Sequence, residues 1–137
     1  MTVEFTEAQG DSSAALGFPS WVEDQVANYC DADPTVEVCG LVLAEPTESG
    51  ALGPMAYEVL DIANIATDPR HFFKMDSEEL AHVAAAWIIP QAVQGIWHSH
   101  PNGPAIPSPS DWETHASSVP LGIYCGGSLR WYRRGRG

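Results

Sequence analysis

The apolar residues of this sequence come in short runs, and the longest unbroken one spans only residues 83–89. A membrane-spanning helix needs roughly 18 such residues in a row, so we expect no such helix. At 137 residues the chain has material for one hydrophobic core rather than two. We therefore expect a single domain over 18–137, preceded by a loose arm over 1–17 that shows little periodicity.

Hydrophobic periodicity predicts helices and strands in groups, with proline and glycine marking the boundaries. Ser20 is expected to cap the first helix, and capping boxes are expected at Asp76 with Glu79 and at Ser110 with Glu113. Runs of strands, with a helix before them and a helix between them, favour an α+β fold or a three-layer α/β/α arrangement over a doubly wound one. The expected helices cover 20–30, 76–89 and a short stretch from 110; the expected strands cover 36–44, 55–65, 71–75, 93–100, 121–124 and 129–133, with a turn-rich loop over 46–54.

Charge is distributed unevenly along the chain. Residues 1–129 carry eighteen acidic and two basic side chains, a net charge of −16. This charge repels a phosphate backbone, so we expect no nucleic-acid partner. The other four basic residues fall within 130–136. That end is interpreted either as an edge strand whose charges discourage pairing, followed by a frayed tail, or as a docking patch for an acidic partner surface.

Neither the N-terminus nor the cysteines indicate an exported protein. The first residues lack a basic start followed by an apolar stretch, so we expect a cytoplasmic protein that does not associate with a membrane. Cys30, Cys39 and Cys125 form an odd number without paired spacing. This pattern indicates reduced thiols rather than a disulfide framework or a cysteine-based zinc site.

Two histidines stand two positions apart in the strand expected over 93–100. His98 and His100 are therefore expected to project from the same face, within reach of one ion. A proline-rich loop leads on to Asp111, and two histidines with one carboxylate leave a fourth zinc position open, as in catalytic zinc sites. The spacing also fits a plain helix start, with Ser108 as N-cap and Asp111 as the capping acid, so by itself it leaves both interpretations open.

These residues resemble the signature of the JAMM (MPN+) zinc metallopeptidases, which consists of a distant Glu, then His-x-His-Pro and, after a loop, Ser-x-x-Asp. The sequence has Glu37, the run 98–101 (HSHP) and the run 108–111 (SPSD), and the resemblance extends over about 18–133. It implies a compact prokaryotic-type member with a cytidine-deaminase-like MPN/JAMM fold, in which a mixed, largely antiparallel sheet is flanked by helices.

The resemblance also implies a role for each residue of the signature. His98, His100 and Asp111 are implied to bind one Zn²⁺ ion, which lowers the pKa of its water to about 7. Glu37 is implied to be the general base and proton shuttle rather than a ligand. Ser108 matches the serine whose hydroxyl donates to the developing oxyanion.

Other residues near the signature are expected to have structural roles. Ser99 alternates away from the two histidines, and Trp97 and Trp112 are expected in the core. His115 could support the site from behind the ligands. The remaining histidines, His71 and His82, are expected at or near the surface.

The resemblance implies hydrolysis of a peptide or isopeptide bond after the Gly-Gly tail of a ubiquitin-like or sulfur-carrier protein. Such a tail can lie extended beside an exposed strand, because glycine has no side chain to clash. Three alternatives remain open. They are a peptidase or amidase with another peptide substrate, as in phage-tail relatives; a RadC-like DNA-associated protein, which the acidic body disfavours; and a non-catalytic MPN scaffold, which the retained ligands disfavour.

Overall fold

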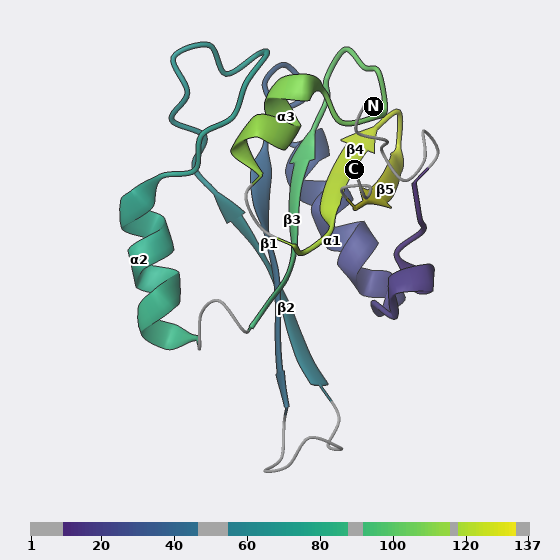
Figure 1. Cartoon of the computed structure of the whole chain (residues 1–137), viewed down its shortest axis with the longest axis vertical. Helices are drawn as coiled ribbons and strands as arrows, with labels where there is room; N and C mark the ends of the chain where they lie inside the picture. Colours follow the sequence, from purple (N-terminus) through teal and green to yellow (C-terminus); the bar gives the residue numbers. More distant parts are fainter. Residues whose placement is uncertain (1–9, 47–54, 88–91, 116–117, 134–137) are drawn as a thin grey trace, which may run out of the picture.

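The computed structural model describes residues 10–46, 55–87, 92–115 and 118–133, which form a five-stranded sheet with helices on both faces (Figure 1). The strand order is β2-β1-β3-β4-β5; β3 and β4 are parallel, and the other three pairs are antiparallel. The expected mixed, largely antiparallel sheet is thereby confirmed. The elements are η1 (Ala14–Leu16), α1 (Ser20–Asp31), β1 (Cys39–Pro46), β2 (Met55–Ile62), α2 (Ser77–Ala86), β3 (Val93–Ser99), α3 (Pro109–Thr114), β4 (Leu121–Cys125) and β5 (Ser128–Tyr132).

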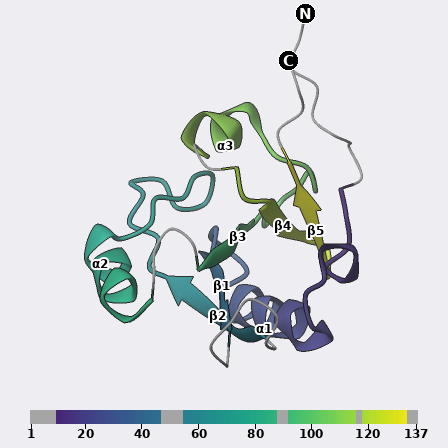
Figure 2. The ribbon, with the colours of Figure 1, turned by 60° about the horizontal axis from the view of Figure 1, so that its bottom comes forward.

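Different helices cover the two faces of the sheet, which gives a three-layer arrangement (Figure 2). Side chains alternate across β1, so Val42 packs in the cluster under α1, whereas Leu41 and Leu43 pack in the cluster beneath α2. On the α2 face, Trp112 of α3 is buried against Leu121 of β4. The sheet therefore has an apolar core on each face, as the α/β/α expectation requires.

Two of the expected strands differ from the observed ones around the same loop. β1 begins at Cys39 rather than at residue 36, so Glu37 lies just before the strand. The stretch 71–75 is not a strand; its β-pairing among the described residues is limited to a single bridge between Asn64 and Met75. Its apolar character has another cause, because Phe73 packs against the ring of His98.

The first two helices begin differently from the sequence expectation. Pro19 occupies the N-cap of α1 without a side-chain hydrogen bond, so Ser20 is the first helical residue and not the cap. Asp76 does cap α2, by accepting from a backbone N–H of the first turn. The partner expected for a capping box, Glu79, instead accepts from the backbone N–H of Ala63, at 3.1 Å. This contact ties α2 to the end of β2 rather than to its own start.

The outer strand β5 is partly covered by the N-terminal segment. Asp11 and Trp131 exchange two backbone hydrogen bonds of 2.8 Å, and Arg130 donates to the carbonyl oxygen of Gly10. The division into an arm and a domain stays a prediction, because residues 1–9 lie outside the described part of the chain, as do 134–137 and most of the expected loop over 46–54. The expected end of the second helix near residue 89 is wrong, because α2 ends at Ala86 and Trp87 is already extended. No helix among the described residues is long and apolar enough to cross a membrane.

Candidate metal centre

Strand β3 carries His98 into the interior and ends one residue before His100. The two rings are tilted by 60° to each other, with 3.0 Å between their Nε2 atoms. The Nδ1 atom of His100 lies 2.7 Å from the carbonyl oxygen of Pro104. Because a carbonyl only accepts, Nδ1 donates there. Burial opposes protonation of His100, but the hydrogen bonds to Asp111 and Pro104 outweigh it and raise the pKa of His100, so that Nε2 can donate to Asp111. Loss of that proton leaves the lone pair of Nε2 directed into the cluster.

The first turn of α3 is closed by a capping box. The Oγ of Ser108 accepts from the backbone N–H of Asp111 at 3.1 Å, and Oδ2 of Asp111 accepts from the backbone N–H of Ser108 at 2.8 Å. Pro109 takes the first helical position, for which its fixed φ and missing N–H suit it. The box expected at Ser110 and Glu113 is therefore wrong, because the cap falls at the residue before the proline.

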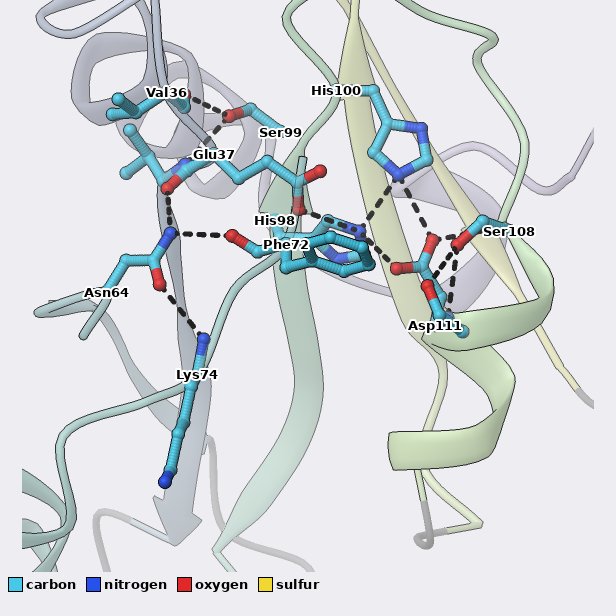
Figure 3. A network of polar contacts seen from close by, with 12 residues as sticks. Val36, Glu37, Asn64, Phe72, Lys74, His98, Ser99, His100, Ser108 and Asp111 are labelled. Atoms are coloured by element: carbon cyan, nitrogen blue, oxygen red, sulfur yellow. Dashed lines mark hydrogen bonds and ion pairs between the residues drawn. The ribbon is translucent and has the colours of Figure 1, made fainter. Parts of the chain in front are cut away.

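The carboxylate of Asp111, which takes part in the capping box at the start of α3, also lies close to both histidines. Oδ1 of Asp111 lies 3.2 Å from Nε2 of His98, and Oδ2 lies 3.1 Å from Nε2 of His100 (Figure 3). The helix-start interpretation of this segment is thus confirmed, and it is compatible with a role of Asp111 in the cluster.

Glu37 completes the cluster from the segment before β1. Its Oε1 lies 3.9 Å from Nε2 of His98. One ligand atom from each of Glu37, His98, His100 and Asp111 can be chosen so that all four lie within 4.8 Å of one another. All four side chains are buried, and none is more than 8% exposed. The structure therefore brings together four of the five residues expected in the site, and the fifth, Ser108, caps the helix beside them.

Burial and hydrogen bonds shift the pKa values of the cluster in different directions. Burial alone would raise the pKa of Asp111, but hydrogen bonds from His100 and His98 hold it well below its usual range. Burial lowers the pKa of His98 and so favours its neutral ring. Burial raises the pKa of Glu37 to about 7, against the opposing effect of His100. Asp111 is therefore the fixed anion, and Glu37 is the carboxyl group able to exchange a proton near neutral pH.

The donor set fits a divalent metal ion. Oε1 of Glu37 is buried without a hydrogen-bond partner among the described residues, and a buried acceptor of this kind requires an explanation. A cation bound between the imidazole nitrogens and the carboxylate oxygens would give their lone pairs a partner. Imidazole and carboxylate donors are ligands that zinc accepts.

A cavity opens onto part of the cluster. A cavity of about 130 Å³ is lined by Glu37, His100 and Ser108, among others, whereas His98 is fully buried. A larger and mainly apolar cavity of about 830 Å³ includes Phe73 in its wall. The ring of Phe73 stacks on His98, with 4.3 Å between the ring centroids. A substrate group can therefore approach the carboxylate of Glu37 and the hydroxyl of Ser108 from the same opening.

The loop between β2 and α2 supplies contacts to the site that the sequence did not indicate. The side chain of Asn64 donates to the carbonyl oxygen of Glu37 at 2.8 Å, and Phe73 covers His98. Ser99, expected to be structural, accepts from the backbone N–H of Val38 at 2.9 Å. No motif distinguishes a loop asparagine or phenylalanine of this kind in a single sequence, because the contacts depend on the tertiary fold.

The other residues singled out in the sequence lie outside the cluster. Trp97 and Trp112 are buried in the core, as expected. His115 is buried beside Trp112, and its Nε2 lies 2.7 Å from the carbonyl oxygen of Val119. His71 and His82 are exposed. The three cysteines are free, with Cys30 and Cys39 buried and Cys125 partly buried.

Comparison with known proteins agrees with this geometry. Residues 19–134 match the family described as prokaryotic homologs of the JAB domain. A protein named desampylase from Haloferax volcanii is 36% identical over 109 residues, which cover 74% of this chain and 73% of that protein. The solution structure of protein DSY2949 from Desulfitobacterium hafniense is similar with a TM-score of 0.55 and 24% identity, covering 80% of this chain and 75% of that one. Because the identity is only 24%, this similarity shows a shared fold alone.

Proposed function

The chain belongs to the family of prokaryotic homologs of the JAB domain, and from this premise we propose that it is a zinc-dependent isopeptidase. Its substrate is a peptide or isopeptide bond that follows the Gly-Gly tail of a ubiquitin-like or sulfur-carrier protein. The observation that carries the proposal is the buried cluster of two histidines and two carboxylates, one of which opens to a cavity. The similarity to the Haloferax volcanii protein named desampylase supports the same class of activity.

In this proposal His98, His100 and Asp111 hold the zinc ion. When bound, zinc is a Lewis acid that polarises a carbonyl and lowers the pKa of water to about 7. The capping box fixes the carboxylate of Asp111, and the contact to Pro104 fixes the ring of His100. The three side chains therefore need little reorganisation to bind the ion.

Glu37 serves as the general base and later as the general acid. Its carboxylate faces the opening that it shares with His100 and lies 3.9 Å from Nε2 of His98. A pKa raised toward neutrality lets one carboxyl group accept a proton from the attacking water and deliver it to the leaving amine. Ser108 lines the same opening, and its hydroxyl donates to the oxygen of the scissile carbonyl as negative charge develops there.

The shape of the opening supports a glycine-ended substrate. A cavity of about 130 Å³ beside Glu37 leaves little room for bulky side chains at the scissile bond. An extended Gly-Gly segment meets this restriction, because its backbone can approach closely. We propose a cytoplasmic setting with a protein substrate and no nucleic-acid partner, in keeping with the acidic body of the chain.

The test pairs metal analysis with a substrate panel. The zinc content of the purified protein is measured by inductively coupled plasma spectrometry, and fusions of β-grasp proteins ending in Gly-Gly are incubated with it and analysed by mass spectrometry. We expect about one zinc per chain and cleavage directly after the second glycine. Cleavage of unrelated peptides alone would favour the general peptidase, and a zinc-free, inactive protein would favour the scaffold.

A further inference from the structure

The backbone N–H and C=O groups of Glu37 are both bound by a loop that contains no residue of the family signature. Glu37 precedes β1, so the regular pairing of the sheet does not begin until Cys39. Its backbone N–H instead donates to the carbonyl oxygen of Pro69 at 2.7 Å, and its own carbonyl oxygen accepts from Nδ2 of Asn64 at 2.8 Å. Both partners belong to the segment 63–76 between β2 and α2.

The carboxamide of Asn64 uses its full hydrogen-bonding capacity in this segment. Besides the carbonyl of Glu37, Nδ2 donates to the carbonyl oxygen of Phe72 at 3.0 Å. Oδ1 accepts from the backbone N–H groups of Ala66 at 3.0 Å and Lys74 at 2.9 Å. An amide group offers two donors and an acceptor with two lone pairs, which match these four contacts. The segment is thus folded around one side chain (Figure 3).

The same segment also contacts the histidine side of the cluster. Phe73 lies between Phe72 and Lys74, whose backbones Asn64 binds, and its ring stacks on His98 at 4.3 Å. No hydrogen bond of Asn64 itself reaches His98, His100 or Asp111. Loss of the carboxamide should therefore displace the Glu37 peptide much more than the three expected ligands.

We propose that Asn64 is a positioning residue for the reaction: its carboxamide fixes the Glu37 peptide so that the carboxylate faces the His98–His100–Asp111 group. The inference rests on the proposed function of Glu37 and deepens it. A displacement of about 1 Å at a reacting group can cost 10²-fold in rate. Loss of Asn64 should therefore lower kcat and leave the metal in place.

Asn64→Asp is the sharpest variant, because it keeps the size of the side chain and the two bonds that Oδ1 accepts. It replaces the donor Nδ2 by a carboxylate oxygen, which then faces the carbonyl oxygens of Glu37 and Phe72. Ser13→Ala is a matched control. The Oγ of Ser13 is buried and accepts from Nε1 of Trp131, and it has no contact with the cluster or with 63–76.

We expect kcat of Asn64→Asp to fall about 10²-fold on a cleavable β-grasp fusion, with KM changed less than about threefold and zinc content unchanged. Ser13→Ala should keep the kcat of the parent protein. If Asn64→Asp keeps its kcat, or loses its zinc in parallel with activity, the positioning role is refuted. Asn64→Ser, which removes most of the four bonds without adding a charge, gives the same readouts should the aspartate variant fail to fold.

A second readout does not require turnover. In metal-free protein, hydrogen exchange at the Glu37 amide, measured by NMR, should be faster in Asn64→Asp than in the parent, while the amides of β1 exchange at the parental rate. Unchanged exchange at Glu37 would overturn the inference even if activity fell. If the parent protein cleaves nothing in the panel, the proposed function fails, whereas the exchange measurement still decides whether Asn64 holds this peptide.

Discussion

The two sides of the cluster are built in different ways. On the ligand side, His100 is fixed by Pro104, four residues away, and Asp111 by Ser108, three residues away. On the base side, the carbonyl of Glu37 is held by Asn64, 27 residues away, and the next residue, Val38, is held by Ser99 across 61 residues of sequence. One side depends on local chain geometry and the other on tertiary packing.

This difference has consequences for stability and for function. A proline-containing loop and a capping box restrict the ligand side through contacts between residues close in sequence. The base side depends on contacts among β3, the segment before β1 and the loop 63–76. We therefore expect substitutions on the ligand side to change metal binding, and substitutions around the base to change turnover at constant metal content.

The largest effect is expected from His100→Ala. The variant loses one of three proposed ligands, so it should lose both its zinc and its activity. The drop in kcat/KM should exceed the roughly 10⁴-fold limit for a general base alone. Zinc content after brief chelation and dialysis measures this directly. A variant that retained stoichiometric zinc would show that the ligand side is assigned incorrectly.

Glu37→Gln should lower kcat about 10²- to 10⁴-fold, because the amide keeps the shape but cannot accept a proton. In chelated protein the same substitution should increase the free energy of unfolding at a pH above 7. A folded-state pKa of about 7 means that the contribution of Glu37 to the free energy of unfolding is present below its ordinary value of 4.5 and is lost as the pH rises to 7.

The chelated glutamine variant should therefore be the more stable protein at pH 8, by about 1–3 kcal/mol, and the difference should shrink toward pH 4.5. Urea unfolding of both proteins at the two pH values checks the sign. An equal difference in the free energy of unfolding at both pH values would show that it does not come from the ionisation of Glu37.

Ser108→Ala tests a residue with two roles: it caps α3, and in the proposed mechanism it donates to the oxyanion. As an N-cap its loss should cost about 1 kcal/mol of stability, and as an oxyanion donor its loss should lower kcat about 10²- to 10³-fold. Ser108→Thr retains a hydroxyl and serves as the matched control. Thermal unfolding and kinetics together decide, since a loss of stability at unchanged kcat leaves only the capping role.

Ser99→Ala should give a smaller kinetic effect than Asn64→Asp. Its Oγ accepts from the N–H of Val38 at 2.9 Å and lies 3.4 Å from the carbonyl oxygen of Val36, so it holds the neighbours of Glu37 rather than Glu37 itself. Leaving that N–H unsatisfied should cost about 1–3 kcal/mol. We expect an approximately tenfold drop in kcat at constant zinc content. A drop in zinc content would contradict the separation of the two sides.

The smallest effect is expected from removal of residues 133–137, which follow β5 in the sequence and have no role in the proposed mechanism. The kcat/KM for a β-grasp fusion should stay within about twofold at low and at high salt. A marked fall at low salt that disappears at high salt would instead identify the arginine-rich end as a docking patch for an acidic partner.

The same contrast explains what the sequence could predict. The ligand side lies within one short stretch, so the spacing of His98, His100 and Asp111 raises a metal site as one of two interpretations, and the family signature then favours it. The apolar periodicity predicts the layers of the fold. Glu37 entered only through the family signature, because nothing local connects it to the histidines. No sequence pattern indicates the contacts of Asn64, since a carboxamide in a loop acquires its partners only in the folded chain.

Three of the errors in the predicted elements lie around the base side and have a related reason. The strand expected over 71–75 is a loop whose apolar residue Phe73 packs on His98, and β1 begins three residues later than its apolar pattern indicates. The capping partner expected in Glu79 binds Ala63 instead. In each case a tertiary contact takes the place of the local one that the pattern indicates.

The zinc content of Glu37→Gln tests the central claim most directly, because it asks whether the two sides of the cluster have separate tasks. The parent protein and the variant are loaded with zinc, dialysed in parallel and analysed by inductively coupled plasma spectrometry. The account predicts about one zinc per chain in both proteins, with turnover lost in the variant. Loss of zinc from Glu37→Gln would make Glu37 a ligand and contradict the account.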